Sequence, residues 1–409
     1  MNIELRRIHT EAEREPWNRA IMRSFFAPEA FDERVQLNNR FANEGCRDTV
    51  AEIDGVIAGT FRSFDTMMTM PEGPDISVDA ITCVTVQGTH RRRGVLTAMM
   101  RADLRDAVDR GQPAAILFSA EYPIYARYGF GVATRSQSVT INKHRTKLAR
   151  VQSEVAARGS IRYVEPQELR DAAPRVFEAT RRMRAGEIGR SEFKWDLETG
   201  VATWPGDKWK GWQVISANEH GVIDGYARWH VDELWDRGMF TSTLHVDAVH
   251  ATSDAASERL WHFLFSLDLI ATIKIRELPI DDPLQWRLSD ARAMVTEHEA
   301  DSLWLRTLDP VALLTSRALN AGVVDVAIID DDGFGAGVFR VEAGSVKRMR
   351  RRTADITMNV STFSMLVLGT VRADVLRRAG LIDENKQGTA TQLSKILAVN
   401  AAPMASTHF

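Results

Sequence analysis

The stretch VTVQGTHRRRGVL, residues 84–96, joins an apolar alternation to a helical pattern through three arginines and a glycine. Val84 and Val86 alternate as on one face of a β-strand, and the residues after Gly94 follow helical spacing. The first N–H groups of a helix lack intrahelical acceptors and lie at the positive end of its dipole. With the arginines beside them, they predict a site for an anion such as a diphosphate. On this stretch alone, a solvated helix cap is the alternative.

A second stretch, AAILFSAEYPIYARYGFG at residues 114–131, favours a binding cleft. Its apolar start predicts a short buried strand, after which tyrosine and glycine become frequent. The small Ala120 suits the wall of a cleft, and Tyr125 and Tyr128 are expected near its mouth. For Tyr128 and Phe130 we prefer the interpretation that they are structural aromatics at the rim.

The residues around these two stretches predict an α/β unit. Residues 48–70 alternate between apolar and polar side chains and turn at Asp54-Gly55, a strong hairpin signal. Residues 94–111 predict an amphipathic helix that ends at Gly111. We therefore expect a first domain over residues 1–150 that carries the anion site.

The next part of the chain repeats the first. Two motifs recur in the same order, GVIAG (55–59) as GVIDG (221–225) and VDAI (78–81) as VDAV (246–249). A helix and an apolar strand follow in both copies, so we expect a second copy of the fold over residues 160–295. A constant offset matches RRRG of the first copy with RLWH, residues 259–262, which predicts that the second copy has lost the anion site. Chance drift of a diverged repeat is the alternative.

From Asp301 the pattern changes to strands joined by an Asp-Gly turn, followed by two helical segments. This predicts a third, α+β domain over residues 301–409, which ends in the irregular tail AAPMASTHF.

Composition and charge narrow the function classes. The chain has 409 residues, 44% of them hydrophobic and 26% charged, as in soluble multidomain proteins. The formal net charge of −3 argues against bulk nucleic-acid binding, and no apolar run reaches the roughly 20 residues that span a bilayer. The chain has only two cysteines, Cys46 and Cys83, and a highly charged first segment. We expect a cytoplasmic protein that binds neither nucleic acid nor membrane.

Taken together, these features resemble the Eis (enhanced intracellular survival) family of GNAT N-acetyltransferases. The resemblance is carried by VTVQGTHRRRGVL, by EYPIYARYGFG, by the tandem duplication and by a third domain that ends in an aromatic residue. It implies α/β and α+β architecture, with two tandem GNAT folds, the second degenerate, and a C-terminal domain like a sterol carrier protein.

The resemblance also implies roles for particular residues. The family strand that pairs with the pantetheine arm of acetyl-CoA matches Val84, Thr85 and Val86. The family turn that holds the pyrophosphate matches Arg92, Arg93, Gly94, Val95, Leu96 and Thr97. The end of the neighbouring strand, also at the cofactor, matches Ala120 and Glu121.

The resemblance further assigns the reacting groups. Tyr125 matches the general acid that protonates the departing CoA thiolate, and the C-terminal carboxylate of Phe409 matches the general base. In the substrate pocket, Asp290 matches a family acid, whereas His408 stands where the family has an acid.

The implied reaction is direct acetyl transfer from acetyl-CoA, with no metal, to primary amines of small cationic substrates such as aminoglycosides. Peptide lysines are a further acceptor class, and a homohexamer is the implied assembly. The alternative is a non-catalytic protein that binds CoA in its first domain or a lipid in its third.

Overall fold

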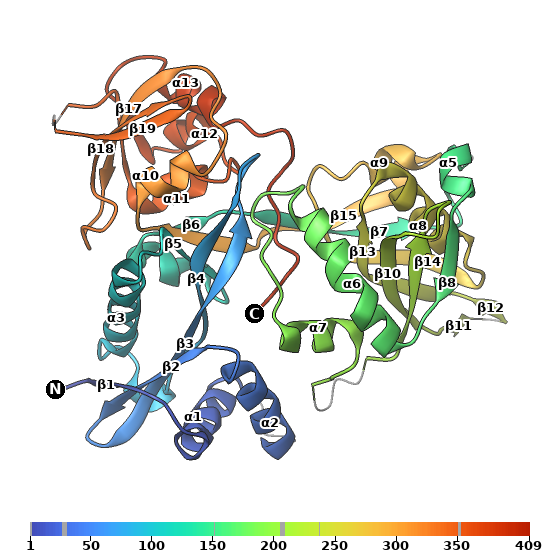
Figure 1. The fold of residues 1–409 in the computed structure, drawn as a ribbon, viewed down its shortest axis with the longest axis horizontal. Coiled ribbons are helices and arrows are strands. Elements are labelled where there is room, and N and C mark those ends of the chain that lie inside the picture. The colour runs from blue at the N-terminus through green and yellow to red at the C-terminus, as the bar shows by residue number, and fades with distance from the viewer. Residues whose placement is uncertain (1, 27–30, 151, 205–208, 237, 351–352) are drawn as a thin grey trace. The chain divides into compact units, whose positions relative to one another are not determined.

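The computed structural model describes residues 2–26, 31–150, 152–204, 209–236, 238–350 and 353–409. The chain divides into two compact units (Figure 1). Unit 1 comprises residues 1–134, 184–190 and 301–409, and unit 2 comprises residues 135–183 and 191–300.

The first sheet of unit 1 has the strand order β1-β2-β3-β4-β5-β16-β6. Its strands are β1 (Glu4–Arg7), β2 (Arg47–Ile53), β3 (Val56–Thr69), β4 (Asp75–Val86), β5 (Ala114–Phe118), β6 (Phe130–Val132) and β16 (Leu303–Thr307). The predicted hairpin turn between β2 and β3 is confirmed, since Asp54 and Gly55 have φ angles of 53° and 75°. Only β4 and β5 run parallel, as a strand–helix–strand connection requires.

Helix α3 (Val95–Asp109) covers one face of this sheet, where Met99 and Leu104 pack into a core with Phe61 and Leu117. Helices α1 (Glu11–Ser24) and α2 (Phe31–Ala42) precede β2, and the short α4 (Tyr122–Tyr125) follows β5. A capping box between Thr10 and Glu13 explains where α1 begins. Within the described residues, no helix has the length and apolar character needed to cross a bilayer.

The third domain belongs to unit 1 and packs on the opposite face of the first sheet. Its sheet, in the order β19-β18-β17-β20-β21, consists of β17 (Val323–Ile329), β18 (Gly337–Glu342), β19 (Ser345–Met349), β20 (Ile356–Asn359) and β21 (Ile382–Glu384). Its helices are α10 (Pro310–Thr315), α11 (Val360–Leu366), α12 (Ala373–Arg378) and α13 (Thr389–Ile396). One apolar core joins Ile116 and Leu305 of the first sheet to Val326 and Phe363 of the third domain. The same core includes Ala405, with Phe409 packed against it, so the C-terminal tail lies close to the first sheet.

Unit 2 contains the second seven-stranded sheet, in the order β15-β7-β14-β13-β10-β9-β8. Its strands are β7 (Arg135–Asn142), β8 (Ser160–Tyr163), β9 (Gly211–Ala217), β10 (Ile223–Asp232), β13 (Ser242–Ala251), β14 (Ile270–Leu278) and β15 (Met294–Asp301), and its helices are α5 (Glu154–Ala157), α6 (Pro166–Arg181), α7 (Glu192–Thr199), α8 (Asp254–Ser266) and α9 (Leu284–Arg287). Phe177 of α6 and Leu260 of α8 belong to two separate cores of this sheet. The short strands β11 (Trp235–Asp236) and β12 (Met239–Phe240) pair between β10 and β13.

The compact units differ from the domains predicted at residues 1–150, 160–295 and 301–409. Strand β7 pairs with β14 and so lies in unit 2, although it precedes residue 150. Strand β16 comes from beyond residue 300 and pairs with both β5 and β6 of the first sheet. Local patterns predict these strands but not their partners, because pairing over such distances along the chain leaves no local signal.

The match of RRRG with RLWH is wrong. Residues 259–262 lie inside α8, where Arg259 is buried and its Nη1 is 3.0 Å from Oδ1 of Asp224. Strand β13 ends at Ala251 and α8 begins at Asp254, so the junction of the second copy is Thr252 and Ser253. The first copy has residues 87–94 at the equivalent place.

Candidate active site

The central strands β4 and β5 separate at their C-terminal ends, where the candidate site lies. Their parallel pairing ends at Ile81 and Leu117, while β4 continues to Val86. On its other side, β4 has a bulge, because Thr85 pairs with Thr60 and Thr82 pairs with Arg62. Residues 83 and 84 therefore have no register partner on the described strands beside them. A bulge next to a separating strand exposes backbone groups that a ligand can bind.

The side chain of Thr60 holds this bulge in place. Its hydroxyl lies 3.0 Å from the carbonyl oxygen of Cys83 and 2.7 Å from the hydroxyl of Thr85. Cys83 itself has a φ of 51°, a conformation that a non-glycine residue adopts only where its surroundings enforce it. The Thr85 side chain is buried and bonded to Thr60, whereas Val84 and Val86 are half-buried.

The predicted anion site lies at the junction of β4 and α3. A 3₁₀ turn covers Gly88–His90, and Arg92 and Gly94 then adopt φ angles of 62° and 83°. No side chain caps α3, and its first α-helical bond runs from the Ala98 amide to the Gly94 carbonyl. The amides of residues 95–97 precede this bond and lie at the positive end of the helix dipole. Gly94 lets the chain turn left-handed there at little cost.

Arg92 and Arg93 are exposed and have no acidic partner among the described residues. Arg101, two turns further along α3, instead pairs with Asp332 at 2.9 Å. Gly59 brings β3 close to this junction, since a Cβ there would lie 2.8 Å from both the Thr85 carbonyl oxygen and Cγ1 of Val95. Close backbone approach, unpaired arginines and an uncapped helix start together fit the diphosphate of a nucleotide cofactor.

Tyr125 is buried at the C-terminal end of α4, with 9% of its surface exposed and its ring 6.1 Å from that of Phe130. Burial and the nearby Glu121 carboxylate raise the pKa of the Tyr125 hydroxyl to about 12. No described residue hydrogen-bonds this hydroxyl. The phenol is therefore protonated at neutral pH and able to donate to a ligand.

Phe409, the last residue of the sequence, packs its ring against side chains of the first sheet. Its ring lies 5.3 Å from that of Phe64 on β3 and 5.1 Å from that of Phe118, the last residue of β5. The His408 ring lies 4.3 Å from Phe118, and Phe41 lies 5.2 Å from Phe64. The chain terminus thus enters an aromatic cluster at the end of β5, immediately before α4 and Tyr125.

The segment 184–190 holds the tail that ends in Phe409. Both oxygens of the buried Glu187 carboxylate accept backbone N–H bonds, from Ser406 at 2.8 Å and from Thr407 at 3.2 Å. Arg190 donates to the Thr407 hydroxyl at 2.9 Å. Backbone bonds from Thr69 to Glu187 and from Gly189 to Met67 attach the same segment to β3. Glu187 therefore fixes the tail relative to the strand against which Phe409 packs.

The remaining predicted residues lie in two places. Ala120 and Glu121 are exposed between β5 and α4, beside the candidate site. Asp290 belongs to unit 2, where its carboxylate is 2.9 Å from Arg145 and also accepts from the Arg292 amide. The structure thus gathers the predicted cofactor residues with Tyr125, Phe409 and His408 in unit 1, while the role of Asp290 stays a prediction.

Sequence reasoning missed Thr60, Glu187 and Arg190. Thr60 directly follows the repeated GVIAG motif, and this position beside a repeated motif could have identified it as a candidate. Nothing in the sequence connects Glu187 to Ser406, because the two residues meet only through the fold of unit 1.

Comparisons with known proteins agree with this architecture. Residues 4–133 and 186–306 match two families that are both described as acetyltransferase (GNAT) domain, and residues 310–406 match the sterol carrier protein domain. An uncharacterized N-acetyltransferase of Streptomyces avermitilis is 34% identical over 100% of this chain and 99% of its own. The N-acetyltransferase Eis of Mycobacterium tuberculosis is 29% identical over 79% of this chain and 78% of its own.

A solved structure covers the whole chain. The crystal structure of Eis1 from Mycobacterium abscessus matches with a TM-score of 0.86 over 100% of both chains, at 27% identity. The predicted order of two GNAT folds and a sterol-carrier-like domain is thereby confirmed. The GNAT fold implies acetyl-CoA as co-substrate, and the named relatives support an acetyltransferase enzyme rather than the non-catalytic alternative. The chain belongs to the Eis family of GNAT N-acetyltransferases.

Proposed function

We propose that this enzyme transfers the acetyl group of acetyl-CoA directly to primary amines of small cationic molecules such as aminoglycosides, with peptide lysines as a further acceptor class. One observation carries the proposal: the chain terminus lies in an aromatic cluster at the end of β5, directly before the helix of Tyr125. Aromatic faces attract cations, so the rings of Phe41, Phe64 and Phe118 suit an ammonium-bearing acceptor.

The residues around the junction of β4 and α3 fit the co-substrate. The amides of residues 95–97 with Arg92 and Arg93 would hold its diphosphate, and the unpaired backbone at Val84 would bind its pantetheine arm. When bound, acetyl-CoA supplies an activated thioester. The Val84 amide would donate to the thioester oxygen as negative charge develops on it.

Tyr125 is the general acid of the proposal. Since its pKa is raised to about 12, its hydroxyl keeps its proton at the pH where the acceptor amine reacts. It donates that proton to the sulfur as the carbon–sulfur bond breaks, and its phenolate regains a proton, directly or through a water, from the nitrogen as the amide forms.

The Phe409 carboxylate is the general base. Its reference pKa of about 3.3–3.7 keeps it ionised at neutral pH. It takes a proton from the acceptor ammonium, directly or through a water, so that the free amine attacks. Because so weak a base transfers protons slowly, the carboxylate also contributes to catalysis electrostatically, through the attraction between its negative charge and the acceptor ammonium.

The test is release of free CoA thiol from acetyl-CoA with kanamycin as acceptor, and without acceptor as control. The proposal expects acceptor-dependent thiol release and a product heavier by one acetyl group or more. Thiol release with lysine peptides but not with any aminoglycoside would overturn the preferred acceptor class. Homohexameric assembly, a cytoplasmic location and the pocket roles of Asp290 and His408 stay predictions, the first testable by light scattering of the 45.9 kDa chain.

A further inference from the structure

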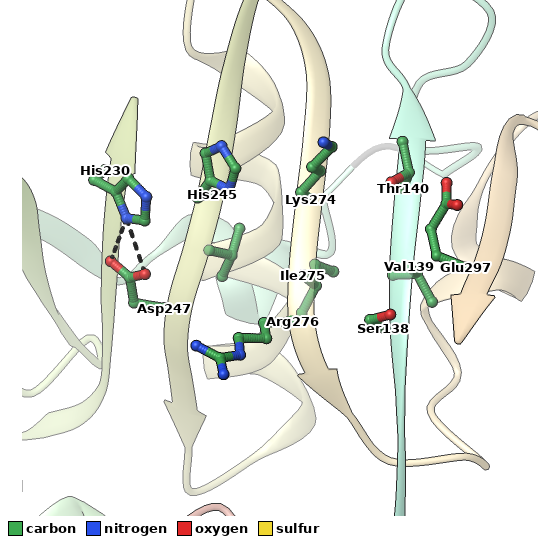
Figure 2. A pocket seen from close by; sticks show the side chains of 11 residues that line it. Ser138, Val139, Thr140, His230, His245, Asp247, Lys274, Ile275, Arg276 and Glu297 are labelled. Atoms are coloured by element: carbon green, nitrogen blue, oxygen red, sulfur yellow. Dashed lines mark hydrogen bonds and ion pairs between the residues drawn. The ribbon is translucent and has the colours of Figure 1, made fainter. Parts of the chain in front are cut away.

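A cluster of histidine and aspartate side chains lies on the sheet of unit 2, and the acetyl-transfer proposal does not use it. His230 of β10 and His245 of β13 are direct partners in the antiparallel register. Their rings stack at 4.6 Å with an angle of 4° between the planes. The two histidines line a pocket of about 580 Å³, together with Lys274, Asp247 and Glu297 (Figure 2).

Each histidine is held by a carboxylate. Nδ1 of His230 lies 3.0 and 3.1 Å from the two oxygens of Asp247, and a dashed line marks each contact in Figure 2. Nε2 of His245 lies 2.8 Å from Oδ2 of Asp232. An ionised carboxylate only accepts hydrogen bonds, so His230 donates through Nδ1 and His245 through Nε2. The lone pairs are then on Nε2 of His230 and on Nδ1 of His245. Asp247 is itself fixed by the indole N–H of Trp209 at 2.8 Å.

We propose that His230, His245 and Asp232 form a binding site for a divalent late-transition-metal ion such as Zn²⁺. One ligand atom from each of the three side chains lies within 4.8 Å of the other two. Two imidazoles and one carboxylate suit zinc and its neighbours rather than Mg²⁺ or Ca²⁺, and they leave a fourth position for water. Asp247 is then the outer partner that orients His230 and raises its basicity.

Binding of an ion requires one imidazole to turn out of the stack, because each ring binds a metal in its own plane and the two planes are nearly parallel. Ligand atoms at about 2.0–2.1 Å from one ion lie at most about 4 Å apart, so the cluster has to contract slightly. The Asp232 side chain is 72% exposed and free to rotate toward the two imidazoles. The Lys274 ammonium and the Arg276 guanidinium also line the pocket. Their charge opposes a bare cation, but it favours an anion in the fourth position.

The metal would link β10 to β13 next to the strand pair β11 and β12, where the Thr241 amide donates to the Leu234 carbonyl at 2.9 Å. Because these contacts lie within unit 2, the proposal does not depend on the acetyl-transfer mechanism.

The test is a titration of untagged, full-length, chelator-treated protein with ZnCl₂, followed by calorimetry and by the rise in melting temperature. We expect one Zn²⁺ per chain and a higher melting temperature. His245→Ala and Asp232→Asn should each weaken binding at least tenfold, and Asp247→Asn about 10–100-fold through the orientation of His230. His220→Ala, which removes an exposed histidine elsewhere in unit 2, should change nothing.

A visible spectrum separates a defined site from loose binding, because four-coordinate Co²⁺ absorbs strongly and aqueous Co²⁺ weakly. The proposal expects this band in the wild type and in His220→Ala, but not in His245→Ala. Absence of stoichiometric binding, or equal binding by a correctly folded Asp232→Asn variant, would overturn it.

Discussion

The two GNAT domains share a strand–glycine–helix framework and differ at the junction that follows the strand. Gly59 pairs with Val86, the last residue of β4, and Gly225 pairs with Ala251, the last residue of β13. Neither glycine has room for a Cβ, which would lie 2.8 Å from the Thr85 carbonyl oxygen in the first domain and 2.9 Å from that of His250 in the second. The same close packing of strand and helix is therefore kept in both copies.

The junctions themselves have opposite properties. In the first domain, residues 87–94 form a turn with three exposed arginines, and no side chain caps the helix that follows. In the second domain, the hydroxyl of Ser253 accepts from the Ala256 amide at 3.2 Å, and Asp254 places negative charge in the first turn. A capped, acidic helix start disfavours an anion. Both copies of the duplicated fold thus keep the same packing, while only the first keeps an uncapped helix start beside exposed arginines.

The largest expected effect concerns Tyr125 of the first domain. Tyr125→Phe removes the proton donor and keeps the ring, so kcat should fall about 10²–10⁴-fold with little change in acetyl-CoA binding. Steady-state kinetics with a saturating amine measures this.

The matched control is Tyr122→Phe, since Tyr122 is exposed on the same short helix and packs against Trp304. It should keep the wild-type rate. Because the pKa of Tyr125 is raised to about 12, kcat should not fall through its ionisation as pH rises from 7 to 10. An unchanged rate in Tyr125→Phe would remove this residue from the mechanism.

The next effect concerns the tail, whose last residue packs against the sheet of the first domain. Glu187→Gln replaces one acceptor oxygen by an N–H donor that faces backbone N–H groups, so the tail should shift. A displacement of about 1 Å at a reacting group costs about 10²-fold in rate. Added residues after Phe409, which move the carboxylate, should have a similar effect on kcat.

Glu342→Gln, at an exposed end of β18, is the control and should leave kcat unchanged. Full activity of a correctly folded Glu187→Gln enzyme would mean that the tail does not need this clamp. Full activity of the C-terminally extended enzyme would contradict the carboxylate as base.

A smaller effect tests the arginines of the first junction. A charge-assisted hydrogen bond contributes about 1.5–3 kcal/mol, so Arg92→Ala and Arg93→Ala should each raise the KM for acetyl-CoA about tenfold or more. The loss should shrink at high salt, which screens exposed charges. Arg105 is exposed on α3, and Arg105→Ala should not alter the KM for acetyl-CoA. An equal rise of KM in Arg105→Ala would mean that the arginines act only through the overall charge of this surface.

The smallest effect concerns the second junction. Ser253→Ala removes a helix cap worth about 1 kcal/mol, so the melting temperature should fall slightly while the KM for acetyl-CoA stays constant. Ser253→Asp, which can still cap, should restore stability. A raised KM in Ser253→Ala would mean that the second domain also takes part in cofactor binding.

The sequence predicts local structure well and long-range structure poorly. The turn at Asp54-Gly55 and the helix after Gly94 were predictable, because both depend on neighbouring residues. The position of the second junction could not be predicted, because β13 and α8 are joined by a shorter turn than β4 and α3. An alignment of the two copies with a constant offset does not allow for this difference in length. The hydrogen bonds from the Ser406 and Thr407 amides to Glu187 could not be predicted either, because no local pattern links these residues.

The most direct test of the central claim is a crystal structure of the enzyme with CoA. We expect one CoA per chain, with its diphosphate within hydrogen-bonding distance of the amides of residues 95–97 and of Arg92 or Arg93, and with no CoA at Ser253. A diphosphate bound at the start of α8, or one that contacts neither these amides nor these arginines, would contradict it.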